Sequence, residues 1–303
     1  MQNLVAVFAL IVLLMLIGRA LAWRRIVPER SADTLNLVVL YVNLPAAVLL
    51  YASRLKWSVA LLGTIAVPWL LLAFSVGAVL LLARILSWSR AVTGVLLLTV
   101  PLGNTSYLGY PLTRALLGPQ ALPYAVVYDQ FGTFVILSTY GVAVLAMYAH
   151  GVRPRPWAIV RRILTFPPFL ALIAALTIVP SALPAPAVTA LTTLAAPMLP
   201  LVALAIGMQL RLKPDRAHRS ALGAGLGLKL LALPALALLL APLLGLHGDA
   251  RAAAVLESGM APMVTAGALA AMAGLVPELA AAMVGYGVVL LLATLPLWLW
   301  LLR

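Results

Sequence analysis

Three ionisable side chains, Asp129, Glu257 and Lys229, stand inside long apolar stretches of the sequence. An ionisable group in the middle of a membrane helix costs about 2.5–3.5 kcal/mol on insertion scales and usually marks a function. Burial in apolar surroundings favours the neutral form of a carboxylic acid, so Asp129 or Glu257 is a candidate for taking up a proton, with Lys229 as the counter-ion. A static buried pair that fixes helix packing is the alternative.

Two apolar stretches are interrupted by prolines, glycines and small polar residues. Proline removes an amide donor and clashes with the preceding turn, and glycine is about 1 kcal/mol worse than alanine inside a helix, so both helices are predicted to break. Each break aims a helix N-terminus, with partial positive charge, into the gap, which favours an anionic group such as a carboxylate. Kinked but continuous helices are the alternative. The interruptions are Pro101-Leu102-Gly103-Asn104-Thr105-Ser106-Tyr107-Leu108-Gly109-Tyr110-Pro111 and Glu257-Ser258-Gly259-Met260-Ala261-Pro262.

The elements that position these residues are predicted to be membrane helices. Hydrophobic residues make up 65% of the 303 positions and charged residues 9%, whereas soluble domains carry roughly a quarter charged residues. A water-soluble fold is therefore excluded, and the sequence predicts an all-α integral membrane protein of ten transmembrane helices. The predicted spans are 4–22, 33–52, 59–83, 91–117, 121–148, 163–179, 187–210, 220–245, 250–275 and 279–301.

The basic residues predict an orientation in the membrane and no nucleic-acid partner, although the net charge is +13. With the N-terminus outside, most of them fall in cytoplasmic turns, as the positive-inside rule requires. We therefore expect a multi-pass protein of the cytoplasmic (inner) membrane with both termini outside, and Trp298 and Trp300 as interfacial anchors. The cytoplasmic group is Arg24, Arg25, Arg30, Arg84, Arg90, Arg153, Arg155, Arg161, Arg162, Arg211, Lys213, Arg216 and Arg219, and the outer group is Arg54, Lys56, Arg251 and Arg303.

The chain is expected to consist of two five-helix repeats, 1–150 and 151–303, with a hinge at 149–162. Five is an odd number, so the repeats would have opposite orientations in the membrane, as in inverted-repeat transporters. Leu44-Pro45 corresponds to Leu199-Pro200, and Pro111 corresponds to Pro262. Counted along the spans from opposite faces, Asn104 and Pro262 lie roughly 20 Å and roughly 18 Å deep, close to the midplane. The two predicted breaks would thus meet at one depth.

Four motifs in chain order carry a resemblance to a known family. Asn104-Thr105, Gly109 and Pro111-Leu112 match an Asn-Thr-x-x-x-Gly-x-Pro-Leu crossover, and the whole set resembles the auxin efflux carrier family, with its plant PIN proteins and bacterial members. The long cytoplasmic loop of many plant members is missing, so auxin specificity does not carry over. The other motifs are Asn43-Leu44-Pro45, Tyr128-Asp129-Gln130-Phe131-Gly132 and Glu257-Ser258-Gly259-Met260-Ala261-Pro262.

The resemblance implies a fold of the bile-acid-transporter type, with a scaffold of spans 1, 2, 6 and 7 and a transport core of spans 3–5 and 8–10. It further implies that spans four and nine cross at the substrate site, that access alternates by an elevator-type movement, and that the scaffold forms a homodimer. The substrate would be a small organic anion, coupled to H+ or to Na+, and no cofactor is expected. The candidate substrate-binding residues are Asn43, Asn104, Thr105, Ser106, Gly109, Pro111, Glu257, Ser258 and Pro262.

Other classes of protein fit the sequence less well. An intramembrane enzyme lacks its residues, because Asp129 is the only aspartate well inside a span and no histidine lies within one. We therefore expect no enzyme and no metal centre. A passive anion channel also needs a polar path, although channels usually build pores from symmetric rings. A channel and a sodium-coupled organic acid symporter stay open as alternatives to a proton-coupled carrier.

Overall fold

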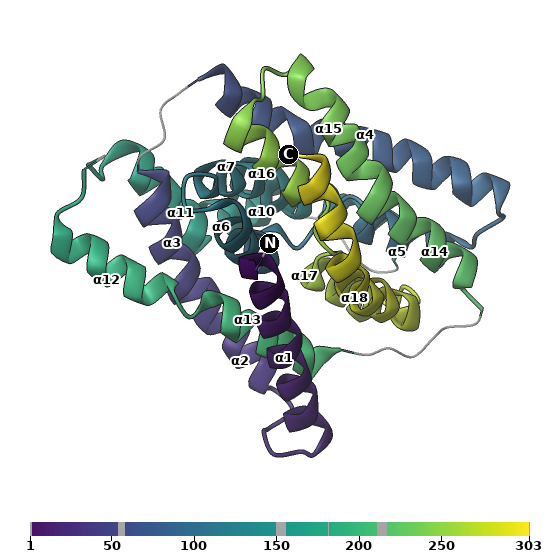
Figure 1. Ribbon diagram of the computed structural model, residues 1–303. Helices are drawn as coiled ribbons and strands as arrows, with labels where there is room; N and C mark the ends of the chain where they lie inside the picture. The colour runs from purple at the N-terminus through teal and green to yellow at the C-terminus, as the bar shows by residue number, and fades with distance from the viewer. Residues whose placement is uncertain (1, 54–57, 150–155, 181, 211–216, 303) are drawn as a thin grey trace. The chain divides into compact units, whose positions relative to one another are not determined.

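The computed structural model describes residues 2–53, 58–149, 156–180, 182–210 and 217–302 (Figure 1). Throughout these ranges the secondary structure is helical, without any β-strand. Residues 150–155 of the predicted hinge, with the repeat boundary at 150 and 151, lie outside the described residues. The described residues also leave out eight of the basic residues from which the orientation in the membrane is predicted: Arg54, Lys56, Arg153, Arg155, Arg211, Lys213, Arg216 and Arg303.

Long apolar helices dominate the described ranges, and six of them are long enough to cross a membrane. Three shorter apolar helices accompany them, at Phe8–Trp23, Arg90–Thr99 and Pro167–Thr177. An all-helical, multi-pass membrane architecture follows from these lengths, whereas ten spans and an inverted repeat stay predictions. The six long helices are Ser31–Ala52, Val59–Ile85, Leu122–Tyr148, Ala185–Gln209, Arg219–Leu243 and Pro277–Leu301.

The chain divides into two compact units. The first comprises residues 1–56, 106–126 and 164–210. Within it α1 packs along α13, and glycines set their close approach (Figure 1). A Cβ atom on Gly18 of α1 would overlap the carbonyl oxygen of Leu204, and one on Gly207 of α13 would overlap that of Met15. The helices of this unit are α1 (Gln2–Trp23), α2 (Ser31–Val38), α3 (Leu44–Ala52), α6 (Tyr110–Leu117), α11 (Pro167–Thr177), α12 (Ala185–Ala195) and α13 (Met198–Gln209).

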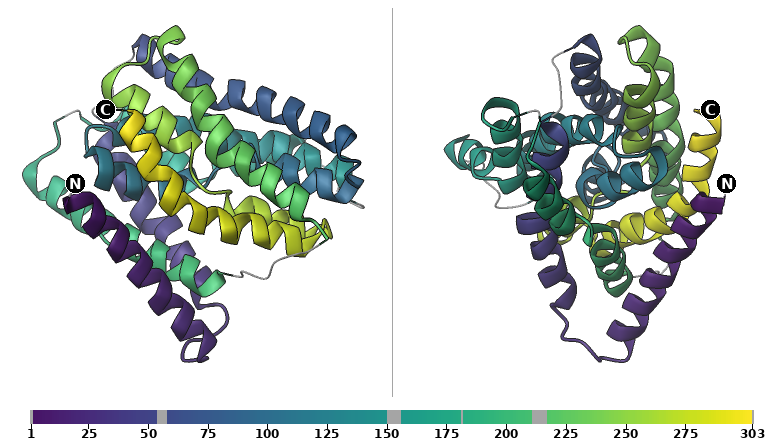
Figure 2. Two further views of the ribbon diagram at one scale, coloured as in Figure 1. Left: turned by 45° about the vertical axis from the view of Figure 1, so that its right-hand side comes forward. Right: turned by 60° about the vertical axis from the view of Figure 1, so that its left-hand side comes forward.

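The second unit comprises residues 57–105, 127–163 and 211–303. Its long helix α15 lies beside α4, and α17 packs on α18 (Figure 2). Ser58 begins α4 because its hydroxyl accepts a hydrogen bond from the amide of Leu61, as an N-cap does. The helices of this unit are α4 (Val59–Ile85), α5 (Arg90–Thr99), α8 (Phe134–Ile136), α9 (Val142–Tyr148), α14 (Arg219–Gly227), α15 (Leu233–Leu243), α16 (Gly248–Ser258), α17 (Val264–Met272) and α18 (Pro277–Leu301). Two helices, α7 (Leu122–Tyr128) and α10 (Pro156–Leu164), extend across the division.

The described helices contain five widened, π-helical segments, a rare form that recurs at functional sites. Three of them end two residues before a proline: Pro45, Pro111 and Pro234. A proline ring clashes with the carbonyl four residues earlier, and a wider turn relieves that clash. The prolines therefore account for three of the five segments. All five are η1 (Val39–Asn43), η2 (Thr105–Gly109), η3 (Asp129–Thr133), η4 (Leu137–Gly141) and η5 (Leu228–Ala232).

Tryptophan indoles donate hydrogen bonds to carbonyls of two π-helical segments. Pro234 has no N–H to offer the carbonyl of Leu230, and the Nε1–H of Trp298 donates to that oxygen over 2.9 Å. The Nε1–H of Trp69 donates to the carbonyl of Phe131 over 3.1 Å. Trp298 is 5% exposed, so its predicted role as an interfacial anchor is wrong: it is a buried partner of η5. Trp300 is 67% exposed, as an anchor would be.

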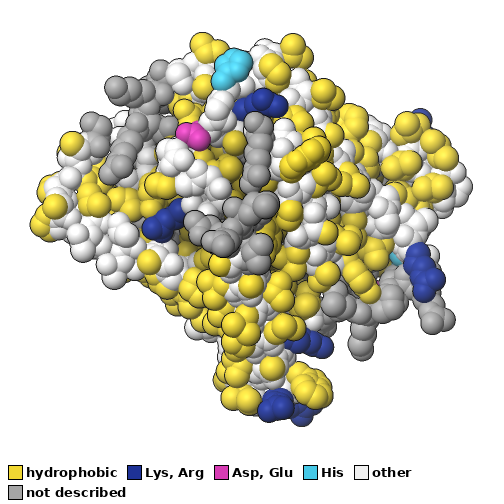
Figure 3. Space-filling view, viewed as in Figure 1, with side chains coloured by type: hydrophobic (Ala, Val, Ile, Leu, Met, Phe, Trp, Pro, Cys, Tyr) yellow, Lys and Arg dark blue, Asp and Glu magenta, His cyan; other side chains and the backbone are white. Residues whose placement is uncertain are grey.

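The exposed surface of the described residues is rich in large apolar side chains. Leu16 on α1, Leu239 on α15 and Met272 on α17 are among the most exposed. Figure 3 shows hydrophobic side chains over most of the visible face, with few Lys and Arg among them. A protein in water rarely exposes contiguous apolar patches of more than a few hundred Å². Lipid is the environment that this surface fits.

Candidate binding and coupling site

The two predicted helix breaks are present and pair with each other through their backbones. α5 ends at Thr99 and α16 at Ser258, and extended segments follow in both. Gly103 and Pro262 form an isolated antiparallel bridge. The amide of Asn104 donates to the carbonyl of Ala261 over 2.8 Å, and the amide of Met263 donates to that of Leu102 over 2.9 Å. Backbone that has left the helix is thereby satisfied, as a buried membrane segment requires.

Pro262 fits the bridge because its position needs no N–H, and Gly103 fits it because there is no room for a side chain. In an antiparallel pair, residues alternate between exchanging hydrogen bonds and standing opposite without exchanging them. The bonds run from the neighbours on either side, so Pro262 stands where no N–H is needed. On its other side Pro262 meets Gly287 of α18, where an added Cβ would overlap the proline ring. A Cβ on Gly103 would lie 2.9 Å from the Nζ atom of Lys229.

Asn104 places a buried amide side chain at the break. The residue is 1% exposed, and its Nδ2 atom has no hydrogen-bond partner among the described residues. A buried donor without a partner costs about 1–3 kcal/mol. An acceptor that enters the gap, such as a carboxylate oxygen, would recover that cost.

Asp129 is the centre of a buried hydrogen-bond network. The hydroxyl of Thr105, the first residue of η2, donates to its Oδ1 atom over 2.5 Å. The amide of Gln130 donates to its Oδ2 atom over 2.7 Å. All three residues have 0% exposure. The hydrogen bond between Asp129 and Thr105 thus connects η3 directly to the break between α5 and η2. A hydrogen bond to an ionised carboxylate is roughly twice as strong as one between neutral groups.

Lys229 lies on the other side of the same break. It is 2% exposed, and its Nζ atom donates to the carbonyl of Ser258, the last residue of α16, over 3.1 Å. Glu257, the residue before Ser258, is fully buried. Tyr128, the residue before Asp129, is buried as well. The three ionisable residues therefore share one polar region of the second unit.

The sequence-predicted residues divide between the two units. Asn104, Thr105, Asp129, Lys229, Glu257, Ser258 and Pro262 are in the second unit, linked by the contacts above. Asn43, Ser106, Gly109 and Pro111 belong to the first. There the amide of Asn43 donates to the carbonyl of Leu194 over 2.5 Å, so it ties η1 to α12.

Sequence reasoning missed three residues of this region as site residues: Gly103, Gln130 and Tyr128. The motif around Asp129 contains both Tyr128 and Gln130, but its resemblance to the family assigns neither of them to the site. A glutamine next to an aspartate in an apolar span is a usable signal, because each buried polar group needs a partner. Gly103 gave no signal of its own among several glycines, since its role depends on a lysine far away in the chain.

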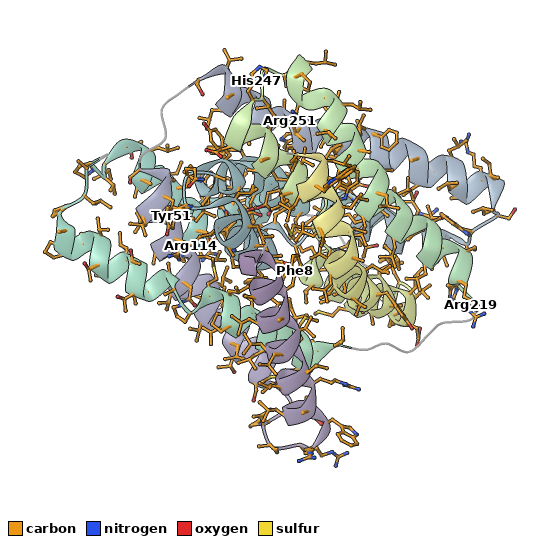
Figure 4. The ribbon with its side chains drawn as sticks, viewed as in Figure 1. Phe8, Tyr51, Arg114, Arg219, His247 and Arg251 are labelled. Carbon is orange, nitrogen blue, oxygen red and sulfur yellow. The ribbon has the colours of Figure 1, made fainter. Side chains whose placement is uncertain are left out.

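The first unit holds a further cationic residue close to an aromatic ring. The guanidinium carbon of Arg114 on α6 lies 5.7 Å from the ring centroid of Tyr51 on α3 (Figure 4). At this distance the ring face attracts the cation. The contact with Tyr51 gives Arg114 a partner inside its own unit. Throughout the described residues, no group of three His, Cys, Asp or Glu side chains could hold a metal ion.

Comparisons with known proteins place the chain among transporters. Residues 4–299 match the model of a family described as membrane transport protein. An uncharacterized transporter of Methanothermobacter thermautotrophicus is 28% identical over 304 residues, which cover 95% of each chain. An uncharacterized transporter of Methanocaldococcus jannaschii is 26% identical over 215 residues, which cover 67% of this chain and 68% of the relative.

Proposed function

Since the chain belongs to the membrane transport protein family of auxin efflux carriers, we propose that it is a secondary active carrier of small organic anions such as carboxylates. The observation that carries this proposal is the pair of broken helices, joined from Leu102 to Asn104 and from Ala261 to Met263. Interrupted helices in corresponding positions of two halves are the best pointer to a transporter's binding site. Unwound backbone, amide donors and a buried asparagine together suit an anionic head group.

The proposed carrier is proton-coupled through Asp129 or Glu257. Both carboxyl groups are fully buried within the second unit, and an ionisable group inside a membrane helix usually marks a function. The hydrogen bond from Thr105 to Asp129 links the protonation of that group to the geometry of the break. Protonation would remove the negative charge of a carboxylate close to the anion, so proton and substrate would bind together.

The wider arrangement that we propose follows the family. Ten spans in two inverted repeats would place the breaks at the midplane of the cytoplasmic membrane, with both termini outside. A scaffold of spans 1, 2, 6 and 7 would dimerise, and a core of spans 3–5 and 8–10 would carry the anion by an elevator-type movement. Tight glycine contacts between α1 and α13, which belong to spans 1 and 7, support the view that these helices move as one body.

Purified protein in liposomes tests the proposal. We expect saturable uptake and counterflow of one member of a panel of mono- and dicarboxylates, stimulated by an inward proton gradient. An unsaturable conductance without counterflow would indicate an anion channel instead.

A double variant tests the proton step separately. In Asp129→Asn with Glu257→Gln, counterflow should persist while the stimulation by a proton gradient disappears. If the double variant kept the full pH dependence of the unmodified protein, the proposed proton coupling would be wrong. Asp249→Asn, which changes an acidic residue in the first turn of α16, is the matched control and should retain the pH dependence.

A further inference from the structure

Lys229 brings a tethered cation to the point where α16 stops. Nearly all of its side chain is buried, and it enters from η5, which Pro234 produces. Its Nζ atom donates to the carbonyl of Ser258 at the C-terminus of α16. The C-terminus of a helix carries partial negative charge, because its last carbonyls have no intrahelical donors. The ammonium group therefore stands at the negative end of a broken helix.

Gly103 has both the ammonium group and a carbonyl oxygen of α16 as close neighbours. A Cβ atom built on Gly103 would lie 2.9 Å from Nζ and 3.5 Å from the carbonyl oxygen of Glu257, so both lie against the same face of Gly103. The side chain of Glu257, the residue before Ser258, is fully buried. Nζ thus has the carbonyl of Ser258 as its hydrogen-bond acceptor, and the carbonyl of Glu257 lies against the same glycine.

Such a set of oxygens is also what a small metal cation takes inside a transporter. Unwound carbonyls and the C-terminal ends of half-helices coordinate coupling ions such as Na+, and carboxylate and carbonyl oxygens suit hard cations in general. Two cations cannot occupy the same buried group of oxygens, because like charges at contact distance repel strongly in a medium of low dielectric constant.

We propose that the ammonium group of Lys229 occupies the place of a mobile metal cation at the end of α16, so that this chain needs no Na+ there. It follows that the substitution Lys229→Ala should open a site for a monovalent metal ion between Ser258, Glu257 and Gly103. Lys229 is then the residue that decides which ion the carrier uses. The statement that Lys229 decides the coupling ion rests on the proposed carrier function. The statement that its ammonium group stands in for a metal ion does not.

The experiment measures thermal unfolding of the purified protein in NaCl, KCl and choline chloride at equal ionic strength. No organic anion is present, so the result stands even if the proposed substrate class fails. We expect the melting temperature of the unmodified protein to be the same in all three salts. Lys229→Ala should melt lower in choline chloride and regain several degrees in NaCl or KCl, with a saturable dependence on the metal ion.

Two matched variants separate a site from a general effect of salt. Lys229→Met fills the same space without charge and should not be rescued by any of the salts. Lys229→Ala combined with Glu257→Gln keeps the space but removes the carboxylate, and should lose most of the rescue. A preparation of Lys229→Ala that survives purification only with Na+ or K+ would also support the proposal.

Three outcomes would overturn it. The unmodified protein could already be stabilised by Na+ in a saturable way. Lys229→Ala could melt at one temperature in all three salts, or it could fail to fold in every one of them. In each case the ammonium group would not be a substitute for a metal ion.

Discussion

Thr105 joins the end of one broken helix to a buried acid in another. Its hydroxyl and the amide of Gln130 supply one donor to each oxygen of Asp129, all within the apolar interior of the second unit. A buried carboxyl group that loses a donor suffers the desolvation cost of the oxygen left behind. Replacing the hydroxyl group of Thr105 by a methyl group should therefore destabilise the buried Asp129.

Thr105→Val is expected to lower the free energy of unfolding by about 1.5–3 kcal/mol, the usual size for a hydrogen bond to a charged group. It should also shift the pH dependence of counterflow, because Asp129 would lose a donor that its charged form uses. Thr99→Val is the control, since Thr99 is equally buried but its hydroxyl donates to Val95 within its own helix. Equal effects of the two variants on the pH profile would contradict the assignment.

Asn104→Ala is expected to raise the KM for the organic anion by roughly 10–100-fold, the factor that corresponds to about 1.5–3 kcal/mol of lost hydrogen bonding. The free energy of unfolding should hardly fall, since the Nδ2 atom has no partner to lose among the described residues. Uptake titrations and melting curves on one preparation check both statements. Asn36→Ala in α2 is the control. A variant that lost stability but kept its KM would show that Asn104 serves the fold instead.

At the scale of elements, a proline of α15 and a tryptophan of α18 act together on η5. Pro234 deprives the carbonyl of Leu230 of its helical donor, and Trp298 of α18 replaces that donor. This replacement couples α18 to η5, and η5 contains Lys229. The packing of one helix thus fixes the position of a charged residue on another.

Trp298→Phe is expected to destabilise the protein by about 1–3 kcal/mol, because the carbonyl of Leu230 would remain buried without a donor. In a Pro234→Ala background the same change should cost less, since the alanine introduced there has an N–H that can donate to the carbonyl of Leu230 along the helix. A double-mutant cycle on melting data measures this coupling. Additive effects would mean that the indole stabilises the protein by packing alone.

At the scale of the whole molecule, the predicted orientation can be tested because the chain contains no cysteine. Ser87, in the exposed turn after α4, is predicted to face the cytoplasm, and Gln120, after α6, to face outward. A membrane-impermeant maleimide added to intact cells should label Gln120→Cys and leave Ser87→Cys unlabelled until the membrane is opened. The reverse pattern would invert the orientation deduced from the basic residues.

The sequence predicted helical class and both helix breaks because these depend on local signals. Hydropathy over about 20 residues identifies membrane helices, and Pro with Gly inside such a stretch interrupts it. It did not predict how the polar residues pair. The contact between Gly103 and Lys229 and the hydrogen bond from Trp298 to Leu230 join residues that are distant in the chain, and neither partner signals the other.

The π-helical segments also have a consequence for aligning such chains. An α-helix turns by about 100° per residue, so one additional residue within a widened turn rotates everything beyond it by that angle. A helical wheel of constant period drawn across Leu122–Tyr148, which holds η3 and η4, assigns residues beyond each of them to the wrong side. A single-residue gap placed at Asp129 or Leu137 would restore the phase, and comparisons of this chain with distant relatives should allow one there.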